Sequence, residues 1–78
     1  MELSRAIAEA VAERAPGTVC PSEVARALWP ADWRAHMDEV RDAAHALADR
    51  GELEVTQGGT VVDGRAARGP VRLRRPAS

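Results

Sequence analysis

The segment from Val40 to Asp63 constrains the fold more than any other, because its apolar residues change spacing partway along. Over 40–47 they recur at intervals of three and four, which is typical of the buried side of a helix. Gly51 then supplies the left-handed stop that glycine adopts without strain. From residue 52 on, apolar and polar residues alternate, and Gln57-Gly58-Gly59 is a turn signal. The segment therefore predicts a helix followed by a strand–turn–strand hairpin.

Two shorter helical patterns precede this segment. The first runs over about 3–14 and ends before Pro16-Gly17. The second spans roughly 21–28 and begins with a proline, whose missing N–H would have no partner at that position. Thr18-Val19 between them could form a short strand. Asp32 could cap a further short turn before the third helix, which we expect over about 37–50.

The C-terminal part continues as a loop over 63–69 and a last strand over 70–74. In that strand Val71 and Leu73 point inward, while Arg72 and Arg74 point outward. A chain of 78 residues can bury only a modest core. We expect that core to contain Ile7, Val24, Leu28, Val40, Leu47, Leu53 and Leu73.

The expected element order, α-β-α-α-β-β, is that of a winged helix-turn-helix domain. In this α+β fold a three-helix core carries a small antiparallel β wing, here over 52–74. We expect a single domain over 1–75 and a flexible C-terminal end over 76–78. The connection between the second and third helices is longer than the three to four residues of the simplest helix-turn-helix. Winged helices most often handle nucleic acid.

The net charge of −1 conceals a strong asymmetry. Residues 1–63 hold six arginines and all twelve acids, a charge of −6, whereas residues 64–78 hold five arginines and no acid, a charge of +5. Four arginines of the expected wing, Arg65, Arg68, Arg72 and Arg74, are therefore candidate phosphate contacts for double-stranded DNA. The alternative is that this basic segment pairs with the acids of the chain's own helices, or is simply a solvated end.

The third helix is a poor reader of DNA. Three of its five outward positions are carboxylates, which repel phosphates. Arg41, and His45 when protonated, are its candidate contacts, and Arg41 could instead pair with Asp38, Asp42 or Asp32. Any duplex binding should therefore be led by the wing, weakly sequence-specific and strongly dependent on salt.

A protein-docking module without nucleic-acid binding is the alternative function, with the acidic third helix as the contact for a protein partner. Trp29 and Trp33 are the aromatic residues of the chain. We expect them to cap the core between the second and third helices. An exposed ring would instead be an interface anchor or a platform for stacking bases.

Catalysis and metal binding are poorly supported, so we expect no enzyme and no cofactor. Cys20 precedes the second helix but has no histidine at helical spacing, and we expect it to be a structural thiol. His36 and His45 are nine residues apart, and His45 with Asp49 is a lone pair of possible ligands. A single cysteine, no apolar span and no signal-peptide pattern indicate a cytoplasmic protein without membrane contact.

Several strings also occur together in the order typical of a known family. They are CPSEVARAL at 20–28, DWR at 32–34, Val40-Arg41 with the alanines that follow, GELEVTQGG at 51–59, VVD at 61–63 and RGPVRLR at 68–74. The chain resembles a small bacterial family catalogued as a domain of unknown function, number 3253. The resemblance extends from about Ile7 to Arg74. It implies a winged-helix fold and no particular activity.

Overall fold

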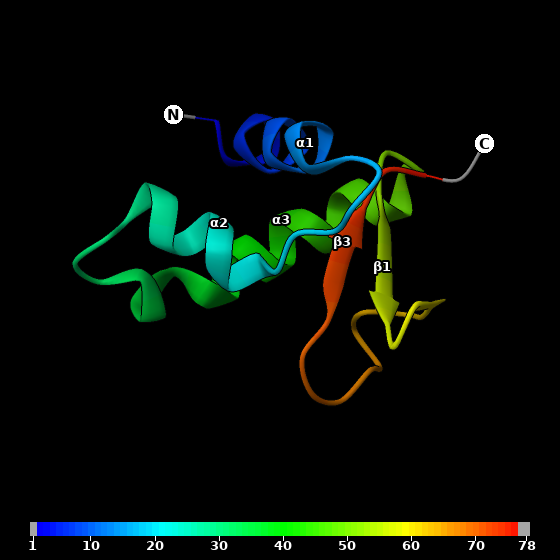
Figure 1. The fold of residues 1–78 in the computed structure, drawn as a ribbon. Helices are drawn as coiled ribbons and strands as arrows, with labels where there is room; N and C mark the ends of the chain where they lie inside the picture. Colours follow the sequence, from blue (N-terminus) through cyan, green and yellow to red (C-terminus); the bar gives the residue numbers. More distant parts are fainter. Residues whose placement is uncertain (1, 77–78) are drawn as a thin grey trace.

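The computed structural model describes residues 2–76 and has an α+β architecture (Figure 1). Three helices are joined to a small antiparallel sheet. The elements in chain order are α1 (Leu3–Arg14), α2 (Pro21–Leu28), the 3₁₀ turn η1 (Trp33–His36), α3 (Met37–Asp49), β1 (Glu54–Gln57), β2 (Thr60–Val61) and β3 (Arg72–Arg74). The predicted helices are confirmed, and α3 ends at Asp49, one residue before the predicted end.

The end of α3 shows how the predicted glycine stop works. Gly51 has a φ of +74°, which lies in the left-handed region. This conformation lets Gly51 N–H donate to the carbonyl of Ala48 at 3.0 Å, and Glu52 N–H donate to the carbonyl of Leu47 at 2.9 Å. Both bonds satisfy carbonyls that a helix end leaves without partners. The chain then turns directly into β1.

The strands form a sheet in the order β2-β1-β3, with antiparallel pairing throughout. The predicted strand at 18–19 is a single bridge, in which Val19 and Leu73 exchange hydrogen bonds of 2.9 and 2.7 Å. In Figure 1 the segment that leaves α1 runs beside β3. The segment between α1 and α2 is therefore joined to β3 by this bridge but adds no strand to the sheet.

The last strand is shorter than predicted, since it covers 72–74 and not 70–74. Pro70 has no N–H to donate to a neighbouring strand. The carbonyls of Arg68 and Pro70 accept hydrogen bonds from the side chain of Gln57 instead. The backbone before β3 is thus held by a side chain of β1 and not by strand pairing.

The core is a single cluster in which all three helices meet the sheet. Its members are Ile7, Val11, Val19, Val24, Ala25, Val40, Ala44, Leu47, Leu53, Val55 and Leu73. Six of the seven predicted core residues are buried, and the seventh, Leu28, is half-buried and packs against the cluster. Trp29 and Trp33 also pack against it, as predicted for rings that cap a core.

Two expectations concern the outside of the molecule. The flexible end expected at 76–78 lies, for residues 77 and 78, outside the described part of the chain. Between residues 2 and 76, each helix lacks the length and apolar character needed to cross a lipid bilayer.

Candidate functional site

The arginines of the predicted wing are mostly engaged with the protein itself. Arg65 donates a 3.0 Å hydrogen bond to the carboxylate of Asp49 at the end of α3. This bond lowers the pKa of Asp49 and raises the pKa of Arg65. Both side chains remain more than half exposed, so the pair ties the loop after β2 to α3 without being buried.

Two further wing arginines are held on the outward face of β3. Arg72 donates to the hydroxyl of Thr18 at 2.8 Å and to the carbonyl of the same residue at 3.1 Å, and it lies 4.0 Å from Glu23. Arg74 donates to Glu54 on β1 at 2.9 Å, and both side chains are half-buried. Three of the four arginines predicted to contact phosphate thus have partners within the molecule. The alternative interpretation expected acids of the helices, and of these three arginines Arg65 has such an acid as its main partner.

Arg68, the fourth, differs from the others. Its backbone carbonyl is held by Gln57, but its exposed side chain makes no ion pair or hydrogen bond with any residue from 2 to 76. The loop 64–71 therefore presents Arg68 as its available cation.

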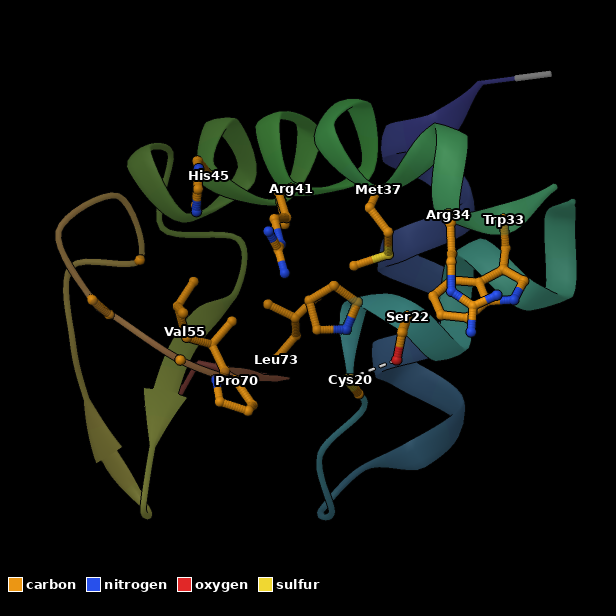
Figure 2. Close-up of a pocket in the computed structure, with 16 residues that line it drawn as sticks. Cys20, Ser22, Trp33, Arg34, Met37, Arg41, His45, Val55, Pro70 and Leu73 are labelled. Atoms are coloured by element: carbon orange, nitrogen blue, oxygen red, sulfur yellow. Dashed lines mark hydrogen bonds between the residues drawn. The ribbon is translucent and has the colours of Figure 1, made fainter.

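The two candidates on α3, Arg41 and His45, meet at a pocket of about 810 Å³. The pocket lies between α3, the start of α2, η1 and the loop 64–71, and the sheet forms its floor (Figure 2). Arg41 extends from α3 into this space. The ion pairs proposed for Arg41 with neighbouring acids do not form among the described residues.

The charges around the pocket are of one sign. Among the described lining residues, Arg34, Arg41 and His45 are the titratable basic groups, and none is an aspartate or glutamate. The rest of the wall is largely apolar and includes Met37, Val55, Pro70, Val71 and Leu73. In a chain whose acids outnumber its arginines, a wall without carboxylates favours an anion.

Trp33 lines one end of the pocket, and two arginines lie over its ring. The guanidinium carbon of Arg26 lies 4.3 Å from the ring centroid of Trp33, and that of Arg34 lies 4.4 Å from it. Such contacts position a guanidinium without neutralising its charge. Neither Arg26 nor Arg34 was predicted as a site residue. The available signal was weak, since it consisted of one arginine beside a tryptophan and another on the preceding helix.

The wall opposite Arg41 is built by the loop 64–71, which approaches α3 very closely. A Cβ atom added to Gly64 would lie 2.8 Å from Nε2 of His45 and 3.1 Å from Cγ1 of Val55. Gly64 is therefore required by space and not by backbone conformation, because its φ is not in the left-handed region. The half-buried ring of His45 is the surface against which this loop closes.

Cys20 lies at another edge of the pocket, where its Sγ is 3.1 Å from Oγ of Ser22. The thiol is half-buried. No histidine pairs with it among residues 2–76, so the arrangement has the features of a structural cysteine and lacks a base that would activate it.

A second polar cluster surrounds His36, outside the pocket. Its ring stacks on Trp29 with centroids 3.9 Å apart, and its two nitrogens contact Glu39 and Asp32, the latter at 3.3 Å. The hydrogen bond with Glu39 is the main cause of a raised pKa for His36. No group of three or more candidate metal ligands occurs in the described part of the chain.

Comparison with known families places the chain. The model of a family described as "Protein of unknown function (DUF3253)" matches residues 1–76. The chain belongs to this family. No curated protein matches the sequence. The family description gives no activity, so the function has to be inferred from the site.

Proposed function

We propose that the chain is a winged-helix module that binds double-stranded nucleic acid weakly and with little sequence preference. In this proposal the contacts come from Arg26, Arg34, Arg41 and Arg68. The observation that carries it is the all-basic set of charged residues around the pocket between α3 and the loop 64–71. The module acts by binding and carries out no catalysis.

The order of the elements supports a winged helix. A strand-like bridge at Val19 lies between α1 and α2, and two helices then precede a pair of antiparallel strands, β1 and β3. The loop between those strands takes the place of the wing. In the usual docking of such domains the third helix approaches the major groove and the wing lies along the backbone. In this chain the four proposed arginines lie on α3 and the elements before it, except for Arg68, which lies on the loop in the position of the wing.

None of the four proposed arginines forms an ion pair with a carboxylate between residues 2 and 76. Arg65, Arg72 and Arg74 would first have to release their partners. Breaking a surface ion pair costs little free energy, but an arginine that must do so binds a phosphate less favourably than an arginine without a partner. The expected contacts are therefore Arg34 and Arg41 at the pocket, together with Arg26 on α2 and Arg68 on the loop 64–71, and not the arginines of β3.

Affinity should nevertheless be low. Asp38 and Asp42 are exposed on α3 and flank Arg41 in sequence, so a duplex that reaches Arg41 also approaches two carboxylates. We expect dissociation constants on the order of 10⁻⁴ to 10⁻⁶ M at physiological salt, the range of non-specific binding.

The test compares two double variants with the same change of charge. Arg34→Gln with Arg41→Gln should abolish the fluorescence-anisotropy response of a labelled random-sequence duplex at low salt. Arg65→Gln with Arg72→Gln should retain it, because those two side chains are already paired. The proposal is wrong if the second variant loses binding and the first retains it.

A protein-docking function is the alternative, and one observation favours it. Asp38 and Asp42 are exposed and make no ion pair within residues 2–76, so α3 offers available acids as well as Arg41. No binding of any duplex at low ionic strength would exclude the first proposal and favour docking. Partner capture that depends on Asp38 and Asp42 but not on Arg34 would then identify the surface.

A further inference from the structure

The pocket beside α3 has properties that contact with a duplex does not explain. Its volume of about 810 Å³ is in the range of small-molecule sites, which run from roughly 300 to 1,000 Å³. A duplex lies across a surface and does not enter a space of this kind. The pocket is therefore considered as a small-molecule site.

The interior of the pocket is apolar. Ala44, Val55 and Leu73 are core residues that form its floor, and Met37 and Val71 are half-buried residues on its walls. When an apolar group enters and displaces water from such a surface, the free energy of binding becomes more favourable. The occupant should thus have an apolar body.

The charged groups define the other part of the occupant. Arg34 and Arg41 are exposed, make no ion pair among residues 2–76, and both line the pocket. Arg41 extends from α3 into the space, and Arg34 lies beside Trp33 at one end (Figure 2). Guanidinium groups bind carboxylate, sulfonate and phosphate oxygens through paired N–H donors. Because no carboxylate lines the pocket, an anionic head group meets cations without repulsion from the wall.

The walls are also held in place before any ligand arrives. The loop 64–71 is tied to α3 through Arg65 and Asp49, and to β1 through Gln57. Trp33 is held at one end of the pocket by cation–π contacts with Arg26 and Arg34. A preformed site loses less entropy on binding than one that must be assembled.

From these observations we infer that the pocket binds a small organic anion with an apolar, ring-sized body, whose anionic group is held by Arg41, while Arg34 adds a second positive charge to the pocket lining. The site shares Arg34 and Arg41 with the proposed nucleic-acid contacts, but its apolar floor and its volume do not enter that proposal.

The experiment uses 1-anilinonaphthalene-8-sulfonate as the anionic probe and N-phenyl-1-naphthylamine as a neutral probe with the same rings. The anionic probe should bind the native chain saturably with one site, measured by its fluorescence. In ¹⁵N spectra the shifts should be confined to residues around the pocket. Arg41→Gln should lower the affinity for the anionic probe by about tenfold or more, as expected for loss of a charge-assisted contact. The affinity for the neutral probe should not change.

Two further variants make the result decisive. Arg5→Gln removes an exposed charge from α1, none of whose residues lines the pocket, and should leave the binding of both probes unchanged. Val71→Trp places a large ring on the pocket wall and should exclude both probes while the circular dichroism spectrum stays native. Equal binding of the anionic probe by the chain and by Arg41→Gln, or shifts centred outside the pocket, would overturn the inference.

Discussion

Gly64 lies so close to His45 that a side chain at position 64 would enter the space of the imidazole ring, with 2.8 Å between the new Cβ and Nε2. This contact sets how far the loop 64–71 approaches α3, and so determines the width of the pocket between them. The two residues come from different elements, and each is unremarkable in its own stretch of sequence.

Gly64→Ala should therefore destabilise the protein by about 1–3 kcal/mol, the usual range for overpacking, in chemical denaturation. His45→Ala in the same chain should recover part of that loss, because the added methyl group then has room. A double-mutant cycle measures the coupling. If the two substitutions prove additive, the loop does not close against His45 as described.

Leu47 is the central core residue of α3 and is 2% exposed. Leu47→Ala should lower the free energy of unfolding by about 2–5 kcal/mol, which is enough to unfold much of so small a domain. The matched control is Val61→Ala. Val61 is 51% exposed, and its truncation should change stability by no more than about 0.5 kcal/mol. Similar losses in both variants would contradict the assigned core.

His36 should titrate above its ordinary pKa, mainly because of its hydrogen bond with Glu39. The folded state thus holds this proton more tightly than the unfolded state does. The resulting stabilisation is complete below about pH 6.5 and is lost as the pH rises through the raised folded pKa. Glu39→Gln should return the pKa of His36 toward its ordinary value in an NMR titration and flatten this part of the pH–stability curve. Glu9→Gln, on α1, should change neither, and a pKa of His36 that is unaffected by Glu39→Gln would exclude this explanation.

The salt dependence of duplex binding follows from the number of available arginines. Four phosphate contacts give a slope of log K against log salt no steeper than about −3.6, at about −0.9 per contact. Arg41→Gln should reduce the slope by about 0.9. Arg72→Gln should leave it unchanged, since Arg72 is bound to Thr18. A slope well beyond about −4 would mean that the paired wing arginines are released on binding.

Local signals in the sequence were sufficient for most of the fold. The apolar stripe of α3 and the glycine at position 51 act within a few residues, so their positions can be read directly from the chain. The boundaries of β3 were less predictable, because the strand begins after Pro70 only where Gln57 takes over the carbonyls before it. These hydrogen bonds join residues that are distant in the sequence, so they form only when the chain folds.

The site was much less predictable than the fold, for a related reason. Arg72 is held by Thr18, 54 residues away, and no local sequence pattern predicts that hydrogen bond. The pocket likewise exists only because the loop 64–71 folds back onto α3. Arg41 and His45, two of the predicted DNA contacts, both line the pocket. Arg65 and Arg74, predicted in the same way, instead lie against carboxylates that are distant in the chain.

The bridge between Val19 and Leu73 has a consequence for the synthesis of the protein. A ribosome makes Val19 well before Leu73, yet the two exchange hydrogen bonds and both belong to the core. Until Leu73 has emerged, the helices must leave part of their apolar surface exposed, because the strand that covers it does not yet exist. Folding should therefore be completed only after β3 has emerged, and chains arrested before β3 should be the targets of chaperones and proteases.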